Sequence, residues 1–242
     1  MLKQYNVPVA PRMPSPYNLL LATIPKSGTN LLRVSLFNYL CHINGDLREK
    51  TCDHMVQAFP NNFNSYLEKR ARAAEDTLLP PGCLDFIYGH KVGPLKRRRL
   101  PFVGPVVLVA RNPLDYIVSS KFYFFLNRGI EIDNAGVIRS RLPPFIAKYL
   151  KMLSLVDEEH ALLLSYEDLF ENPSKTLAKV AEHYGLPVDH GLLELAAKHG
   201  SIRAAREFEN KYGQMHIGTE RKRETVSVSR SVPFVCDGRI GQ

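Results

Sequence analysis

A lysine, a serine, a glycine and a threonine stand together where an apolar run gives way to a helical pattern. The stretch is Ala22–Leu32, ATIPKSGTNLL. At a strand-to-helix turn, the backbone N–H groups of residues 27–30 would point out of the helix start and bind a phosphate-like anion. Lys26 and the hydroxyls of Ser27 and Thr29 would add donors. The stretch lacks the spacing of a nucleotide triphosphatase loop, and a plain connection with a solvated lysine is the alternative.

An arginine at the end of another apolar run could hold a second anion. In VLVARNPLDYIVSS, Arg111 ends a predicted strand, and Ser119 lies two turns into the next predicted helix. A planar guanidinium matches the oxygens of a phosphate group. An ion pair between Arg111 and Asp115 is the alternative. Two anion sites at the ends of neighbouring strands indicate one ligand that carries two separated phosphates.

Short apolar runs predict the strands that must position these groups. The runs cover residues 18–24, 85–89, 105–110 and 161–166. Each is too short for a helix and ends in polar or glycine-rich residues. Three of them lead quickly into helical patterns. This alternation predicts an α/β fold with three layers (α/β/α), in which a central, mostly parallel sheet binds ligands at the carboxyl ends of its strands.

Two of the predicted helices carry clear start and stop signals. One has Asn112 as N-cap, Pro113 at its first position and Gly129 as its stop. Another begins at Pro173 and stops at Gly185.

Three other segments are predicted to lie outside the regular elements. We interpret residues 42–82 and the loop-like segment 126–145 as insertions over the edge of the sheet that bears the ligand. From about Gly213 the chain is basic and lacks apolar periodicity, so we expect loops there.

The chain of 242 residues has a formal net charge of +8, which suits nucleic acid, an anionic membrane or a polyanionic small molecule. Its scattered cysteines lack the spacing of a metal site and are typical of a reducing compartment. No apolar stretch reaches the roughly 20 residues of a membrane span, so we expect a cytoplasmic protein. The run KRRR at 96–99 is interpreted as a solvated basic turn, with nucleic-acid or membrane binding as the alternative.

Three motifs, in this order, resemble the sulfotransferases that use 3′-phosphoadenosine-5′-phosphosulfate (PAPS). That family has P-K-S-G-T-T-W, then R-N-P-x-D-x-x-V-S, then Y-E-D followed by a helix that begins with proline. This chain has PKSGTN, RNPLDYIVSS and YEDLFENPSKTLAKVAEHYG, which together span residues 25–185. We therefore expect residues 1–242 to form a single sulfotransferase domain with a P-loop-like turn that binds phosphosulfate.

The resemblance also implies roles for individual residues. Lys26 would lie near the oxygen between phosphorus and sulfur, and His90, which ends DFIYGH, would be the base that deprotonates the acceptor. A strand-end histidine bonded to a backbone carbonyl is the alternative. The other implied nucleotide contacts are Ser27, Gly28, Thr29 and Asn30 at the 5′-phosphate, Arg111 and Ser119 at the 3′-phosphate, Tyr166 and Ser201 near the adenine, and Gly238 near the C-terminus.

The chain departs from the family pattern at several positions. Leu31 stands where the family has tryptophan, so adenine stacking must come from another side chain. Tyr88 replaces a lysine two residues before the base. Cys236 and Asp237 stand where a basic pair is expected. The chain stops where the family has a further tryptophan, so a C-terminal truncation is an open alternative.

The resemblance implies direct in-line transfer of a sulfuryl group from PAPS to a hydroxyl, with adenosine 3′,5′-bisphosphate (PAP) as product and no metal. The acceptor would be a small molecule, a glycan or a lipid, with neither nucleic acid nor a membrane span involved. Aromatic and apolar residues in 55–66 and 122–125 lean toward an apolar or phenolic acceptor, although core and helix packing is the favoured explanation for any single one of them. A small-molecule kinase and a non-catalytic nucleotide-binding module remain as alternatives.

Overall fold

A parallel four-stranded sheet forms the centre of the protein. The computed structural model describes residues 17–51, 54–55, 58, 78–90, 103–128, 131–159 and 161–212. The strands lie in the order β2-β1-β3-β4, and every neighbouring pair is parallel. Their bounds are β1 Tyr17–Thr23, β2 Cys83–Gly89, β3 Val103–Ala110 and β4 Leu162–Ser165. All four strands predicted from the apolar runs are confirmed.

The strand β1 lies between β2 and β3 and is buried on both faces. Leu19 and Leu21 belong to one apolar core, whereas Leu20 and Ala22 belong to another. All four are fully buried, at 0% exposure. Side chains of a strand alternate between the two faces of its sheet, so a continuous apolar run such as this one requires helices on both sides.

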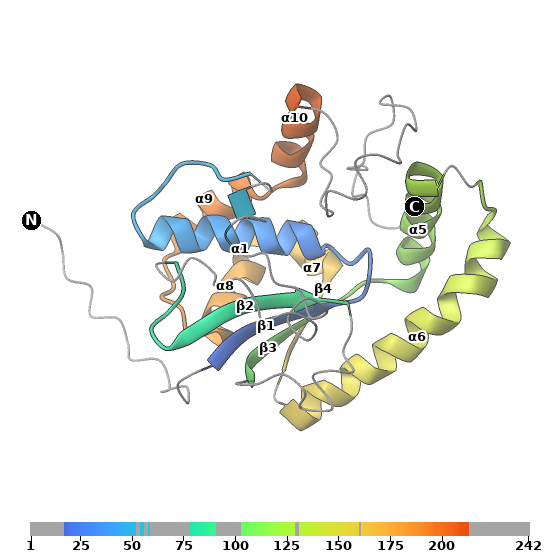
Figure 1. The fold of residues 1–242 in the computed structure, drawn as a ribbon, viewed down its shortest axis with the longest axis horizontal. Coiled ribbons are helices and arrows are strands. Elements are labelled where there is room, and N and C mark those ends of the chain that lie inside the picture. Colours follow the sequence, from blue (N-terminus) through green and yellow to red (C-terminus); the bar gives the residue numbers. More distant parts are fainter. Residues whose placement is uncertain are drawn as a thin grey trace, which may run out of the picture.

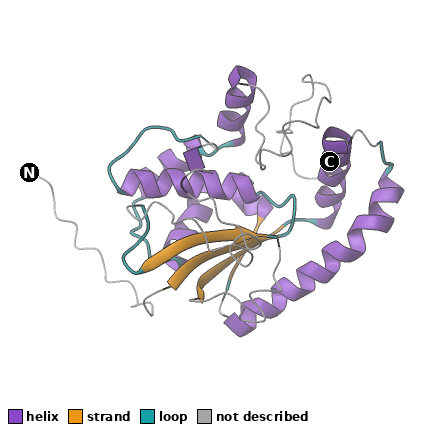
Figure 2. Ribbon diagram, viewed as in Figure 1, coloured by secondary structure: helices purple, strands orange, loops and turns teal. Residues whose placement is uncertain are grey.

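Helices supply those two outer layers (Figures 1 and 2). The core on one face holds residues of α1 (Thr29–Ile43), α8 (Pro173–His183) and α9 (His190–His199). The core on the other face holds residues of α5 (Pro113–Arg128) and α6 (Asn134–Glu159). Two further helices, α7 (Tyr166–Glu171) and α10 (Ile202–Tyr212), complete the described elements. The predicted three-layer α/β architecture is confirmed.

The helix α5 starts as its sequence predicts. The Asn112 side-chain oxygen accepts a hydrogen bond from the Leu114 N–H at 2.9 Å, and Pro113 is the first helical residue. The helix ends at Arg128, directly before the predicted stop. In the same way, α8 begins at Pro173 and is followed by Gly185 at φ 67°, a conformation that favours glycine.

The prediction of a loop over residues 126–145 is wrong. α5 continues to Arg128, and α6 begins at Asn134 and contains Pro143 and Pro144. The two prolines each remove a backbone donor and weaken the helical signal. Burial offsets that cost, because Val137 and Phe145 of this helix are only 0% and 3% exposed and belong to the apolar core.

The other predicted insertion, residues 42–82, is only partly described. Its first residues, His42 and Ile43, still belong to α1, and Met55 is packed in the core beside α1. Residues 59–77 lie outside the described part of the chain. The position of this insertion over the ligand-bearing edge therefore stays a prediction, as do the loops expected after Gly213.

Candidate active site

The carboxyl ends of three neighbouring strands bring the predicted site residues together (Figure 1). His90 follows β2, the Lys26 turn follows β1, and Arg111 follows β3. In the strand order, β2 lies beside β1 toward one edge of the sheet, and β4 lies beside β3 toward the opposite edge. The point between β1 and β3 is therefore a topological switch point, where parallel α/β sheets bind their ligands.

The turn after β1 leaves the start of α1 open to an anion. α1 begins at Thr29 with Gly28 as its N-cap residue, no side chain caps it, and its first turn holds no acidic residue. Helix geometry leaves the first backbone N–H groups without partners inside the helix, and the helix dipole adds positive potential there. This opening is the feature that a 5′-phosphosulfate would require.

Ser27 contributes differently from the expectation. Its N–H donates to the Ile24 carbonyl at 3.1 Å, so this amide closes the turn. Its hydroxyl is buried and has no hydrogen-bond partner within the described residues. A buried polar atom without a partner is costly unless a ligand or water satisfies it. The hydroxyl of Ser27 is therefore the group through which it would contact an anion.

The turn is packed against Tyr166, the first residue of α7. Gly28 has φ 76°, and a Cβ added there would lie 2.6 Å from Cδ2 of Tyr166. Tyr166 is only 5% exposed. Tyr166 therefore packs against the turn at Gly28. Its contact with adenine stays a prediction.

Arg111 joins the turn to the end of β3. Its Nη1 donates to the Lys26 carbonyl at 3.1 Å, and its guanidinium carbon lies 4.1 Å from the centroid of the Tyr166 ring. Within the described residues Arg111 has no carboxylate partner, and its Nε is buried without a hydrogen bond. The alternative ion pair with Asp115 is absent there, which leaves the guanidinium with capacity for an anion.

His90 is tied to the same turn through Thr23, the last residue of β1. The Nδ1 atom of His90 lies 3.2 Å from the Thr23 carbonyl and 2.9 Å from the Thr23 hydroxyl. The Thr23 hydroxyl lies in turn 2.6 Å from the hydroxyl of Thr29. The contact with the Thr23 hydroxyl allows either tautomer, but a carbonyl oxygen only accepts hydrogen bonds, so the contact with the carbonyl assigns the proton to Nδ1. The lone pair of the neutral ring is therefore on Nε2, where a base needs it.

The surroundings of His90 favour the neutral imidazole. Desolvation by the surrounding protein lowers its pKa, although part of the side chain is exposed. The positive charges of Lys148, Arg33 and Lys26 lower the pKa further, and the hydrogen bond to Thr23 opposes them. Arg33 is 2% exposed, with its guanidinium carbon 3.3 Å from the Tyr88 ring centroid. This cationic environment suits a neutral base beside a bound anion.

Two of the remaining predicted contacts, Ser119 and Ser201, lie in α5 and directly before α10. Ser119 is partly buried on α5, two turns from Arg111. The Ser201 hydroxyl accepts from the Ala204 N–H at 3.1 Å and so begins α10, beside the close approach of Gly200 to Ser35 on α1. Gly238 lies outside the described residues.

Thr23 is the site residue that the sequence reasoning missed. A threonine that ends an apolar strand directly before the Lys-Ser-Gly-Thr turn is the signal that could have identified it. Its two side-chain bonds reach partners 6 and 67 residues away, and the longer separation depends on strand order.

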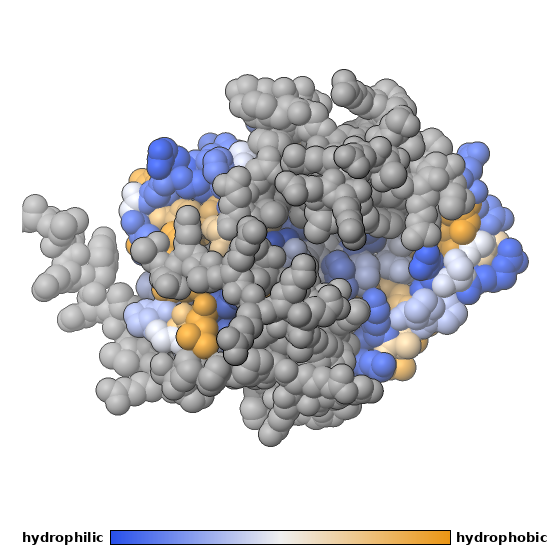
Figure 3. All heavy atoms as spheres, in the orientation of Figure 1, coloured by the Kyte–Doolittle hydropathy of each residue, from blue (hydrophilic) through white to orange (hydrophobic). Residues whose placement is uncertain are grey.

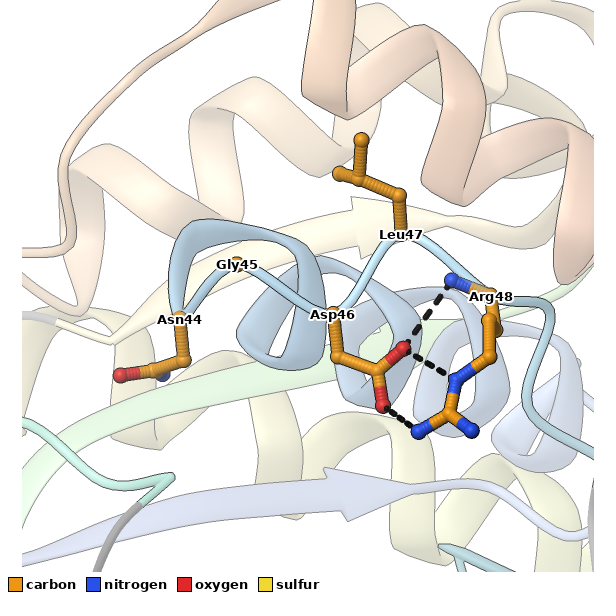
Figure 4. Close-up of a pocket in the computed structure, with 5 residues that line it drawn as sticks. All are labelled: Asn44, Gly45, Asp46, Leu47 and Arg48. Atoms are coloured by element: carbon orange, nitrogen blue, oxygen red, sulfur yellow. Dashed lines mark hydrogen bonds and ion pairs between the residues drawn. The ribbon is translucent and has the colours of Figure 1, made fainter. Parts of the chain in front are cut away.

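The pocket drawn in Figure 4 lies elsewhere. It is lined by Asn44–Arg48, directly after the C-terminal end of α1, where Asp46 pairs with Arg48. A helix of 15 residues spans about 22 Å at about 1.5 Å per residue, so this pocket is remote from the turn.

The described residues show neither a cluster of metal ligands nor a membrane-spanning helix. In the residues that the structure describes, no three His, Cys, Asp or Glu side chains gather as metal ligands. No helix of the described chain is long and apolar enough to cross a membrane.

Comparisons with known proteins agree with this geometry. A family model described as "Sulfotransferase domain" matches residues 105–231. Sulfotransferase 2A6 of Mus musculus is 24% identical over 211 residues, covering 78% of this chain and 67% of the relative. The 3-alpha-hydroxysteroid sulfotransferase of Cavia porcellus is 26% identical over 207 residues, covering 77% of this chain and 65% of the relative. The chain thus spans about two thirds of the length of these curated relatives.

A solved structure has the same fold. Retinol dehydratase, in complex with androsterone and the inactive cofactor PAP, superposes with a TM-score of 0.66 at 18% identity. The match covers 98% of this chain and 76% of that one.

Proposed function

The chain belongs to the sulfotransferase domain family, and from this premise we propose that it transfers a sulfuryl group from PAPS to a hydroxyl group. The observation that carries the proposal is the position of His90 beside the turn, to which Thr23 links it. The bond to the Thr23 carbonyl is the one expected of a purely structural histidine, and it is compatible with catalysis because it leaves Nε2 outside that bond. The position of His90 supports a base beside an open helix start, which is the pair of groups that sulfuryl transfer requires.

The residues of the turn fit a nucleotide with a 5′-phosphosulfate. The uncapped start of α1 and the unpartnered Ser27 hydroxyl would bind the phosphate oxygens. Arg111, with Ser119 on the next helix, would bind a 3′-phosphate. The nucleotide supplies the activated sulfuryl group. Its two anionic ends would thus lie on either side of the switch point between β1 and β3.

His90 would act as the general base. With Nδ1 donating to Thr23, Nε2 is free to take the proton of the acceptor hydroxyl as its oxygen attacks sulfur. Lys26 would stabilise negative charge on the departing phosphate oxygen. Transfer would be direct and in line, so the protein contributes positioning and electrostatic stabilisation and forms no covalent intermediate.

The proposed acceptor is an apolar alcohol. One relative is named for a 3α-hydroxysteroid, and the retinol dehydratase structure was solved with androsterone. These names support a hydroxyl on a large apolar molecule as the first class to test. Simple phenols, sugars and lipids form the comparison panel.

Nucleotide binding tests the proposal directly. PAP should raise the melting temperature far more than AMP does, because a ligand that binds the native state stabilises it by mass action. EDTA should leave that difference unchanged. A small-molecule kinase would instead be stabilised by ATP with magnesium, and a non-catalytic module would bind PAP without transferring label from PAPS. Equal shifts with PAP and AMP would remove the 3′-phosphate site from the proposal.

A further inference from the structure

The Arg111 guanidinium contacts both the Lys26 carbonyl and the Tyr166 ring. One guanidinium nitrogen, Nη1, donates to the Lys26 carbonyl inside the phosphosulfate turn. The same guanidinium lies over the Tyr166 ring, which also packs beneath Gly28. The proposed 3′-phosphate contact therefore touches the turn on which the other end of the nucleotide would bind.

The carbonyl that Arg111 holds belongs to a strained residue. Lys26 has φ 67°, and it is the one residue other than glycine with positive φ in the described part of the chain. A residue with a side chain is disfavoured in this region, because its Cβ comes too close to the backbone. Such a conformation persists only when neighbouring contacts determine it. The bond from Arg111 is a contact of this kind, because it fixes the Lys26 carbonyl from the opposite side of the switch point.

Resting on the proposed function, we propose that Arg111 is also a positioning residue for the phosphosulfate turn. It holds the Lys26 peptide in the conformation that opens the start of α1, and the Tyr166 ring fixes the guanidinium in place. The two phosphate sites are thus coupled through one side chain. Loss of Arg111 weakens binding at the 5′ end even for a nucleotide that has no 3′-phosphate.

Adenosine 5′-phosphosulfate is the probe that separates this role from a simple 3′-phosphate contact, because it carries the phosphosulfate and lacks the 3′-phosphate. Calorimetry would give its dissociation constant and that of PAP for the wild type, Arg111→Ala and Ser119→Ala. Ser119 is the matched control, because it is a proposed 3′-phosphate contact without a bond to the turn. We expect Arg111→Ala to weaken both ligands, adenosine 5′-phosphosulfate by about tenfold, whereas Ser119→Ala weakens PAP alone.

Chemical rescue distinguishes loss of the Arg111 contact from misfolding of the Arg111→Ala variant. Ethylguanidinium fits the space left by Arg111→Ala and can restore the bond to the Lys26 carbonyl, whereas ethylammonium lacks the planar donors. Ethylguanidinium should recover part of the affinity for adenosine 5′-phosphosulfate, and ethylammonium should not.

The possible failures are distinguishable. If Arg111→Ala binds adenosine 5′-phosphosulfate as the wild type does and loses only PAP, the positioning role is overturned and the proposed function stands. If the wild type binds PAP no better than AMP, the proposed function itself fails.

Discussion

At the scale of single residues, Thr23 decides what His90 can do. Its carbonyl fixes the proton on Nδ1, and its hydroxyl joins the histidine to Thr29. A ring held this way keeps one tautomer and one orientation. In the proposed mechanism, the Nε2 atom that would take the proton is therefore oriented before any acceptor arrives.

Replacing His90, the proposed base, should separate catalysis from binding. His90→Ala should lower turnover at least about a hundredfold, because general-base help is worth roughly 10²–10⁴-fold. PAP affinity should stay at the wild-type value, as measured by calorimetry. His190, exposed at the start of α9, is a matched control, and His190→Ala should leave turnover unchanged. Near wild-type turnover for His90→Ala would direct the search for the base to the carboxylates.

The rate should depend on pH through His90. Its pKa lies below the ordinary value because of desolvation and then the neighbouring cations. In the proposed mechanism the neutral ring is the active form, so the rate should stay high as the pH falls to about 6.5 and decline only below it. Lys148→Ala removes one of those cations, so it should move the decline to higher pH in initial-rate profiles. A decline that persists unchanged in His90→Ala would belong to another group.

At the scale of elements, the turn and α7 form one packed unit. Gly28→Ala should destabilise the protein and weaken PAP binding, because the new methyl group would meet the Tyr166 ring at 2.6 Å. Gly45 is the matched control: it has φ 90°, and nothing lies within 4 Å of an added Cβ. Both changes carry the backbone cost of about 1–2 kcal/mol. Gly28→Ala should cost a further 1–3 kcal/mol, roughly, from overpacking.

Denaturant unfolding of the two variants measures that difference. Equal losses of unfolding free energy for Gly28→Ala and Gly45→Ala would show that Tyr166 yields to the added methyl group. The turn would then be less rigid than its packing indicates.

The elements were predictable where the signal is local. The continuous apolar run of β1 and the Asn112-Pro113 start of α5 depend on neighbouring residues only, and both are confirmed. The helix α6 was not predicted, because Pro143 and Pro144 weaken the helical signal of a segment that tertiary burial of Phe145 sustains. The Thr23–His90 contact was missed because it also depends on tertiary structure: it forms only when β1 and β2 pair.

At the scale of the whole molecule, acid should destabilise the fold. The pKa values of His90, His183 and His199 are all lowered in the folded state, in each case mainly by desolvation. The unfolded chain therefore binds protons at these positions first, as the pH falls below about 6.5. The free energy of unfolding is fully retained above that pH and should decrease below it.

Urea unfolding at pH 7.5, 6.5 and 5.5 would measure this loss. The Asp46 carboxylate does not confuse the result, because hydrogen bonds from Arg48 and Lys50 hold its pKa well below this range. His183→Gln, which removes one of the three groups, should reduce the pH dependence. A protein that is equally stable at the three values would contradict the assignment.

The central position of β1 has a consequence for synthesis on the ribosome. β1 is the earliest of the four strands in the chain, all seven of its residues are buried, and it pairs with both β2 and β3. From Thr23 to Ala110, the end of β3, 87 residues must still be translated. At about 5–20 residues per second this takes roughly 4–17 seconds. Throughout that interval the nascent chain exposes an apolar strand without its final neighbours, which is a target for chaperones and for aggregation.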